Sequence, residues 1–282
     1  MKFDLASLVR QRRIPRQRAV VFRDIVPPAI FASNLFQRVY APMIALWRRY
    51  AEQITAEYER SLSALTTDAP ADINTTLSAA DNELQRLLLL LTPALRDWLI
   101  RLEAWQRGKF VAAVLSASSV DLTTLLSSGD VSETLDQVLA WNVNLISDVS
   151  AQAKQRISNA VFAGLTARTP AREVAKEIAA ATGFARDRSL RIASHQLSSL
   201  TSQLAAQRRR QAGIDVWEWR HSSKRHPRQE HLARNGDLYS DNPDMVGVEI
   251  DGKTVKASPP SDDLPGIKPG CGCRERSVLV FS

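Results

Sequence analysis

Two long apolar stripes at helical spacing constrain the fold of this chain more than any other feature. Stripes of this kind indicate α-helices with one apolar face. Helices this long must bury their stripes against each other or against a partner, so we expect an antiparallel helical hairpin. The first stripe comprises Leu35, Val39, Met43, Trp47, Tyr50, Ile54, Tyr58, Leu62 and Leu65; the second comprises Ile73, Leu77, Leu84, Leu88, Leu91, Leu95, Trp98, Leu102 and Trp105.

Local signals predict where these helices and the next one begin. Pro42 lies within the first stripe and is expected to kink or restart that helix. The sequence SSGD at 127–130 indicates a loop. Asp130 and Glu133 have the spacing of a capping box, so we expect a third helix to open there.

Two further helices are expected before residue 213. Thr169-Pro170 fits the start of a short helix, and Gly183 fits its end. A last helix follows, with apolar residues at spacings of three and four, and ends before Gly213. His195 lies beside its apolar stripe, which favours a structural or solvent-facing histidine.

Beyond Gly213 the apolar period changes from about 3.6 to 2, the period of a β-strand. Asn235-Gly236 and Asp251-Gly252 favour tight hairpin turns, and residues 277–281 fit a closing strand. We therefore expect a mainly α fold, in which a long-helix body ends in a small, β-hairpin-rich C-terminal module of α+β character. The expected segments are a basic arm (1–28), a long-helix hairpin (29–128), a helical part (129–213) and a β-rich module (214–282).

Composition excludes several classes of protein. Uninterrupted apolar runs such as Leu87–Leu91 are far too short to span a bilayer, and we expect no secretory signal because the N-terminus lacks its apolar core. Cys271 and Cys273, separated by one residue, do not make a disulfide framework, which favours assembly in a reducing cytoplasm.

Positive charge gathers in two regions. Residues 1–23 contain seven basic residues and one acidic residue, and residues 208–234 contain eight basic and three acidic residues. A solvated surface and contact with DNA phosphates both explain such charge. The predicted nucleic-acid-binding residues are Arg10, Arg12, Arg13, Arg16, Arg18, Arg208, Arg209, Arg210, Arg225 and Arg228.

Histidines and cysteines near the C-terminus raise two alternatives. His226, His231, Cys271 and Cys273 would make a Cys2His2 zinc set, because residues i and i+2 of a strand point to the same side. In the other interpretation, the thiols are packed in a compact module and His231 hydrogen-bonds a turn.

Catalysis has little support in the sequence. We find no acidic pair, phosphate-binding glycine loop, nucleophile elbow or dinucleotide fingerprint, so no catalytic residue is predicted. A nucleic-acid-processing enzyme with a metal site near His231 is one alternative function. A free-standing DNA-binding adaptor is another.

The C-terminal region resembles the phage head morphogenesis family, the minor head proteins similar to protein F of phage Mu. The resemblance covers roughly residues 130–282. It rests on the order of a tryptophan in a strand, a basic segment, a histidine followed five residues later by glycine, a proline-rich loop and a Cys-x-Cys-Arg ending. In this chain the motif residues are Trp219, His231, Gly236, Cys271, Cys273 and Arg274.

The resemblance implies a non-enzymatic virion protein of a tailed bacteriophage. Such a protein would act in head assembly at or near the portal, in several copies, and influence DNA packaging or ejection. Its expected partners are the portal protein, other head proteins and packaged double-stranded DNA, without a membrane. Assembly in the host cytoplasm and residence in the phage head follow from the same resemblance.

Overall fold

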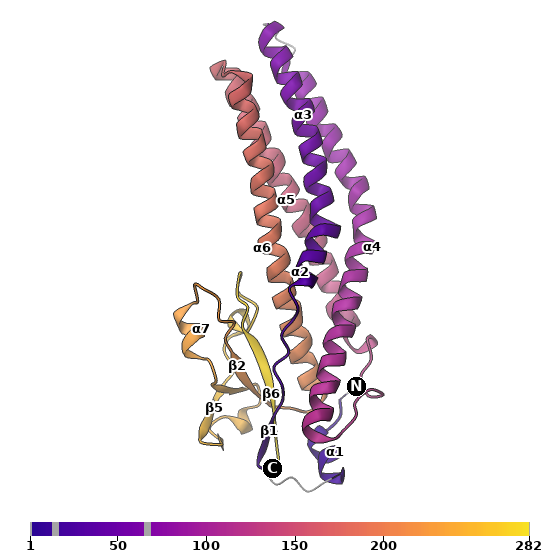
Figure 1. The fold of residues 1–282 in the computed structure, drawn as a ribbon, viewed down its shortest axis with the longest axis vertical. Helices are drawn as coiled ribbons and strands as arrows, with labels where there is room; N and C mark the ends of the chain where they lie inside the picture. Colours follow the sequence, from indigo (N-terminus) through magenta and orange to yellow (C-terminus); the bar gives the residue numbers. More distant parts are fainter. Residues whose placement is uncertain (1, 13–16, 65–68, 282) are drawn as a thin grey trace. The chain divides into compact units, whose positions relative to one another are not determined.

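The computed structural model describes residues 2–12, 17–64 and 69–281 and confirms a mainly α fold with a small strand-rich C-terminal module (Figure 1). The α-helices are α1 (Leu5–Arg12), α2 (Ile30–Leu35), α3 (Ala41–Ala64), α4 (Ala69–Ser118), α5 (Ser132–Ala167), α6 (Ala171–Gln211) and α7 (Gln229–Ala233). The strands are β1 (Ala19–Val21), β2 (Val216–Arg220), β3 (Leu238–Ser240), β4 (Glu249–Ile250), β5 (Lys253–Ala257) and β6 (Arg274–Val280). Within these described ranges, no helix is both long and apolar enough to cross a membrane.

Two compact units make up the chain, and each is built from separate stretches of sequence. Unit 1 comprises Met1–Phe31, Ile100–Leu135 and Ser194–Ser282, and unit 2 comprises Ala32–Leu99 and Asp136–Ala193. The division falls within α4, α5 and α6. Each of these helices therefore contributes to both units.

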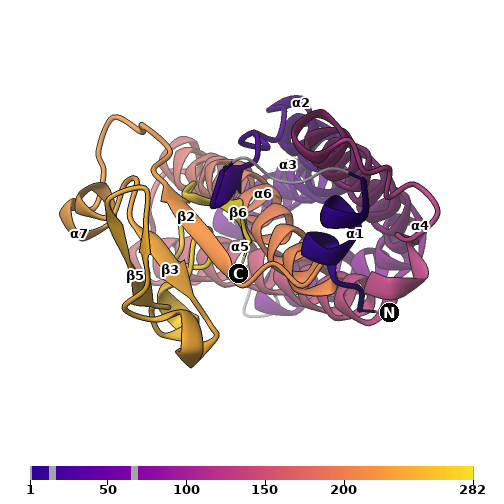
Figure 2. The same cartoon turned by 90° about the horizontal axis from the view of Figure 1, so that it is seen from below.

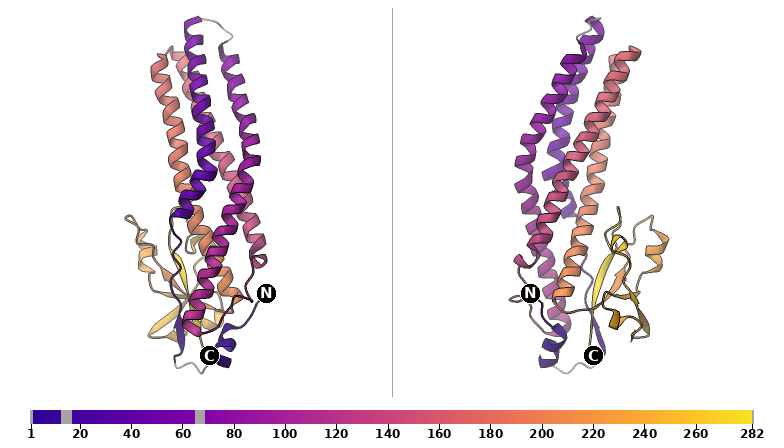
Figure 3. Two further views of the ribbon diagram at one scale, coloured as in Figure 1. Left: turned by 45° about the vertical axis from the view of Figure 1, so that its right-hand side comes forward. Right: turned by 180° about the vertical axis from the view of Figure 1, so that it is seen from behind.

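Unit 2 contains the predicted helical hairpin. Arg49 and Tyr50 of α3 contact Glu83 of α4, while Glu57, two turns further along α3, accepts a 2.7 Å hydrogen bond from Thr76 Oγ1. The contacts run backwards along α4 as they run forwards along α3, so the two helices are antiparallel. Figure 3 shows them side by side in both views. The Trp47 indole is fully buried and donates to Ser150 Oγ at 2.6 Å.

Helix ends agree only partly with the sequence-based expectations. A π-helical segment, Phe36–Tyr40, runs directly into α3, so Pro42 lies just after a π-bulge inside a continuous helical run, where the regular i→i−4 hydrogen-bond ladder is already interrupted. The prediction that Gly183 ends a helix is wrong, because α6 continues through it to Gln211. Asp130 accepts from the backbone N–H of Ser127, upstream of the helix that the capping box was expected to open.

The sheet of unit 1 has the strand order β1-β6-β2-β3-β5-β4. Only β3 and β5 pair in parallel; the other neighbours are antiparallel. Figure 2 shows β2, β3 and β5 side by side. The Asp251-Gly252 hairpin is confirmed: it joins β4 to β5, and both turn residues have positive φ, +48° and +76°. Asn235-Gly236 instead closes the turn between α7 and β3.

The N-terminal segment belongs to the core of unit 1. Leu5 and Val9 of α1 are buried in one apolar cluster with Phe22, Val114 and Leu279. Strand β1 pairs with β6 at the sheet edge, with Ala19 opposite Val280. The apolar side chains of the predicted basic arm therefore hold it against the rest of unit 1.

Candidate functional site

Four motif residues that are far apart in sequence meet in unit 1. Helix α7 carries His231, strand β2 carries Trp219, and the loop before β6 carries Cys271 and Cys273. All four side chains are buried. The Trp219 ring meets the His231 ring edge-on, with 5.1 Å between the centroids. Gly236 adopts φ of +89° and donates its N–H to the Trp219 carbonyl at 2.8 Å, so this turn connects α7 to β2.

One nitrogen of His231 lies close to both sulfurs. His231 Nδ1 is 3.5 Å from Cys271 Sγ and 3.9 Å from Cys273 Sγ. The Cys273 backbone N–H also points to Cys271 Sγ at 3.4 Å. One donor atom from each of the three residues fits within 4.8 Å of the others. Within the described residues, this is the group whose donor atoms suit a metal ion.

The other nitrogen of His231 faces a carboxylate. His231 Nε2 is 2.9 Å from Asp263 Oδ1, and Asp263 also pairs with Arg234 at 2.8 Å and Lys268 at 2.6 Å. Burial disfavours the charged carboxylate, but hydrogen bonds from Lys268, His231 and Arg234 hold the pKa of Asp263 well below its ordinary value. An ionised Asp263 can only accept a hydrogen bond, so it favours the His231 tautomer with its hydrogen on Nε2 and the lone pair of Nδ1 on the side of the sulfurs.

Each of the two thiols shifts the pKa of the other. The hydrogen bond from the Cys273 thiol lowers the pKa of Cys271, and the same interaction raises the pKa of Cys273. Cys271, His231 and Asp263 also have the connectivity of a nucleophile, its base and an orienting acid. A nucleophile must be reached by substrate, however, and Cys271 is 4% exposed. Two buried thiols beside one imidazole suit a set of metal ligands better than a catalytic nucleophile.

The predicted metal residues are only partly brought together. His231, Cys271 and Cys273 form the cluster, but His226 is exposed and outside it, so its assignment as a ligand is wrong. The sequence reasoning missed Asp263, which lies 32 residues from His231 without any motif spacing to link them. His195, expected to be structural or solvent-facing, is half-buried, and its Nδ1 has no hydrogen-bond partner. Burial lowers the pKa of His195, and the charge of the Cys271 sulfur opposes that shift.

Two arginines predicted to contact nucleic acid are interior. Arg208 is fully buried and pairs with Glu103 at 2.6 Å. Arg209 is 2% exposed and pairs with Asp241 at 2.9 Å and Glu275 at 3.3 Å. Phosphates cannot reach either guanidinium, so these two assignments are corrected: both residues neutralise buried or partly buried acids.

Other predicted nucleic-acid contacts remain at the surface. Arg10 and Arg12 lie on the last turn of α1, and both are exposed. The side chains of Arg18, Arg210, Arg225 and Arg228 are also exposed. Arg228 donates a hydrogen bond to the Pro269 carbonyl at 2.9 Å. Arg13 and Arg16 lie outside the described residues.

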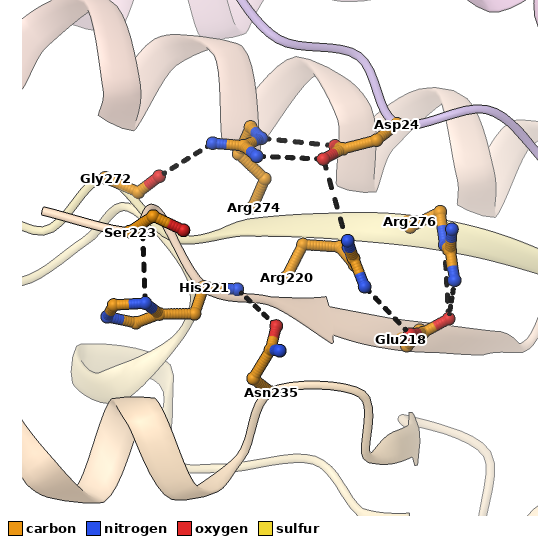
Figure 4. A network of polar contacts seen from close by, with 9 residues as sticks. All are labelled: Asp24, Glu218, Arg220, His221, Ser223, Asn235, Gly272, Arg274 and Arg276. Atoms are coloured by element: carbon orange, nitrogen blue, oxygen red, sulfur yellow. Dashed lines mark hydrogen bonds and ion pairs between the residues drawn. The ribbon is translucent and has the colours of Figure 1, made fainter.

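Arg274, the last motif residue, anchors the N-terminal segment. Its Nε and one terminal nitrogen donate to the two carboxylate oxygens of Asp24 at 3.1 and 2.8 Å. Figure 4 shows Asp24 also facing Arg220, whose guanidinium lies 3.4 Å from Glu218. This network joins strands β2 and β6 to residue 24, so Arg274 has a structural role in unit 1.

Comparisons with known proteins give one distant relative. A Haemophilus influenzae protein described as uncharacterized is 25% identical over 164 residues. The match covers 57% of this chain and 33% of that protein, so the aligned region is a minor part of the relative's length. No family model and no solved structure matches the chain.

Proposed function

We propose that this chain is a minor head protein of a tailed bacteriophage, a non-enzymatic component that acts in head assembly at or near the portal. In this proposal it assembles in the host cytoplasm, resides in the virion in several copies, and influences DNA packaging or ejection. The proposal rests on the resemblance of residues 130–282 to the head morphogenesis family.

The observation that best supports the proposal is the convergence of the motif. Trp219, His231, Cys271 and Cys273 pack together in one buried cluster, although 52 residues separate Trp219 from Cys271. The motif residues thus form one buried centre in unit 1, as we expect of residues that belong to a shared module. Chance matches scattered along the chain would have no reason to meet.

In this proposal the long helices supply the protein contact. Two adjacent leucines of α4, Leu89 and Leu90, are 76% and 73% exposed. Large apolar side chains at a helix surface lose water contact when a partner covers them, which favours association. We therefore assign the portal contact to this part of unit 2.

The test is co-purification with the portal protein encoded by the same genome, performed at low salt. The wild-type chain should be retained, and Leu89→Ser with Leu90→Ser should reduce retention because the apolar contact is lost. A matched control, Gln53→Ser with Arg60→Ser, changes two exposed residues of α3 and should bind normally. If both variants bind as well as the wild type, the contact at Leu89 and Leu90 is refuted. If the wild type itself is not retained, the portal association is refuted.

A further inference from the structure

The His231 cluster has the dimensions of a metal coordination sphere. Zinc binds nitrogen at about 2.0–2.1 Å and sulfur at about 2.3 Å, so two such ligands at a tetrahedral angle lie about 3.6 Å apart. The distances from His231 Nδ1 to Cys271 Sγ and Cys273 Sγ are 3.5 and 3.9 Å. The three donors therefore already stand at nearly the separations that one zinc ion imposes.

We propose that His231 Nδ1, Cys271 Sγ and Cys273 Sγ bind one Zn²⁺, and that His195, whose donor atoms do not lie within 4.8 Å of all three in this structure, turns toward the ion as the fourth ligand. The inference does not depend on the proposed head function. Two thiolates and two imidazoles in a closed site select zinc over harder cations such as magnesium and calcium. His195 replaces the exposed His226 in the set expected from the sequence.

His195 is the fourth ligand for two reasons. Its Nδ1 is buried and has no hydrogen-bond partner, which is costly for a polar atom unless it binds something. Helix α6 also lies against the loop that carries the thiols, because Ser202 Oγ, two turns beyond His195, donates to the Cys273 carbonyl at 3.5 Å. Because α6 carries His195, a bound metal would connect this helix to α7 and to the loop before β6.

Asp263 supports the site from outside the coordination sphere. Metal-ligating histidines usually donate their second N–H to a carboxylate, which fixes the tautomer and the ring orientation. Asp263 Oδ1 occupies that place at 2.9 Å from His231 Nε2. Arg234 and Lys268 hold the carboxylate in turn, at 2.8 and 2.6 Å.

Burial assigns the metal a structural role. His231, Cys271 and Cys273 are each at most 4% exposed, as in closed structural zinc sites, whereas catalytic sites keep one position open to substrate. The segment from η4 (Ser261–Asp263) to β6 has no strand or α-helix of its own. Metal binding would fix this loop against α7 and so stabilise the module directly.

The test uses the full-length chain purified without added metal. Elemental analysis should find about one zinc per chain, and Co²⁺ exchanged into the site should show thiolate-to-cobalt charge-transfer absorption and tetrahedral d–d bands. A metal-free wild type that also fails to show these cobalt bands overturns the proposal. So does an intact mass showing that Cys271 and Cys273 have lost two hydrogens to a disulfide.

Variants separate the ligands from their neighbours by chelator competition. Asp263→Asn should weaken zinc binding about 10- to 100-fold, as loss of an outer-shell partner does. His195→Ala should weaken it at least as much, and His226→Ala, the matched control, should leave it unchanged. Unchanged affinity in His195→Ala overturns the assignment of the fourth ligand. Since Cys271→Ser with Cys273→Ser can impair folding, the cobalt spectrum of the wild type carries the central claim.

Discussion

Arg208 shows at the scale of one residue how unit 1 holds a buried charge. Its terminal nitrogens donate to Glu103 Oε1 at 2.6 Å, to the Ser127 carbonyl at 2.8 Å and to Gln211 Oε1 at 2.9 Å. Glu103 is itself 1% exposed. A charge removed from water this completely is stable only while its partner is present.

Glu103→Ala should therefore lower the free energy of unfolding by about 3–5 kcal/mol, since it removes the closest acidic partner of the buried Arg208 guanidinium and leaves the more distant Asp130, at 3.6 Å. Chemical denaturation followed by tryptophan fluorescence measures the change. The control is Asp136→Ala, which removes the exposed Arg96–Asp136 pair of unit 2, 3.5 Å apart, and should cost less than about 1 kcal/mol. Equal costs for the two variants would contradict the buried-pair account.

At the scale of elements, helix α6 has one glycine in its interior, Gly183, and one just after its end, Gly213. Gly213 has φ of +63° just after α6, and a Cβ there would lie 3.0 Å from the Phe3 carbonyl oxygen. Gly183 lies within α6 with no heavy atom within 4 Å of an added Cβ. The two glycines thus have opposite structural roles.

Gly213→Ala should destabilise the chain by about 1–2 kcal/mol, because a left-handed backbone is unfavourable for residues with a Cβ. Gly183→Ala should instead stabilise it by about 0.5–1 kcal/mol, because alanine loses less conformational freedom in a helix. Thermal and chemical unfolding of both variants measures the difference. A destabilised Gly183→Ala variant would mean that α6 is broken at this position in solution.

The same contrast explains which parts of the fold can be predicted from the sequence. The stripes from Leu35 to Trp105 predict the helical hairpin, because helical periodicity is a local signal. The prediction of a helix end at Gly183 was wrong, because glycine marks a helix end only when the surrounding contacts require positive φ. The pairing of β1 with β6 is a contact between opposite ends of the chain, and no local pattern encodes it.

The site was predictable to a similar degree. Spacing within Cys-x-Cys placed both thiols on one side, and the family motif drew attention to His231. The contributions of Asp263 and His195 depend on how the loop before β6 and helix α6 meet the cluster. Only the folded chain gives that information. The predicted zinc set therefore included His226, which is close to His231 in the sequence.

For the molecule as a whole, the net charge of +7 is not spread as the sequence suggested. Arg208 and Arg209 are paired inside unit 1, and Arg274 and Arg220 engage Asp24. Among the predicted DNA-contact residues that the structure describes, three stay exposed near the N-terminus (Arg10, Arg12 and Arg18) and three in the second basic region (Arg210, Arg225 and Arg228). If these arginines meet DNA phosphates, we expect the attraction to duplex DNA to be independent of sequence.

Duplex binding should weaken steeply with salt, with a log-log slope of about −0.9 for each phosphate neutralised. Replacing Arg10, Arg12, Arg13, Arg16 and Arg18 together by glutamine should flatten that slope, because fewer counterions are released on binding. The measurement is fluorescence anisotropy of a labelled duplex across a salt series, with two unrelated sequences to test sequence independence. The control replaces five exposed arginines of unit 2: Arg48, Arg60, Arg86, Arg168 and Arg172. Both variants lose the same net charge. If the N-terminal arginines contact the phosphates, the slope becomes flatter in the N-terminal variant and stays unchanged in the unit 2 variant. An equal slope in the two variants would assign DNA binding to net charge and remove the N-terminal arginines from it.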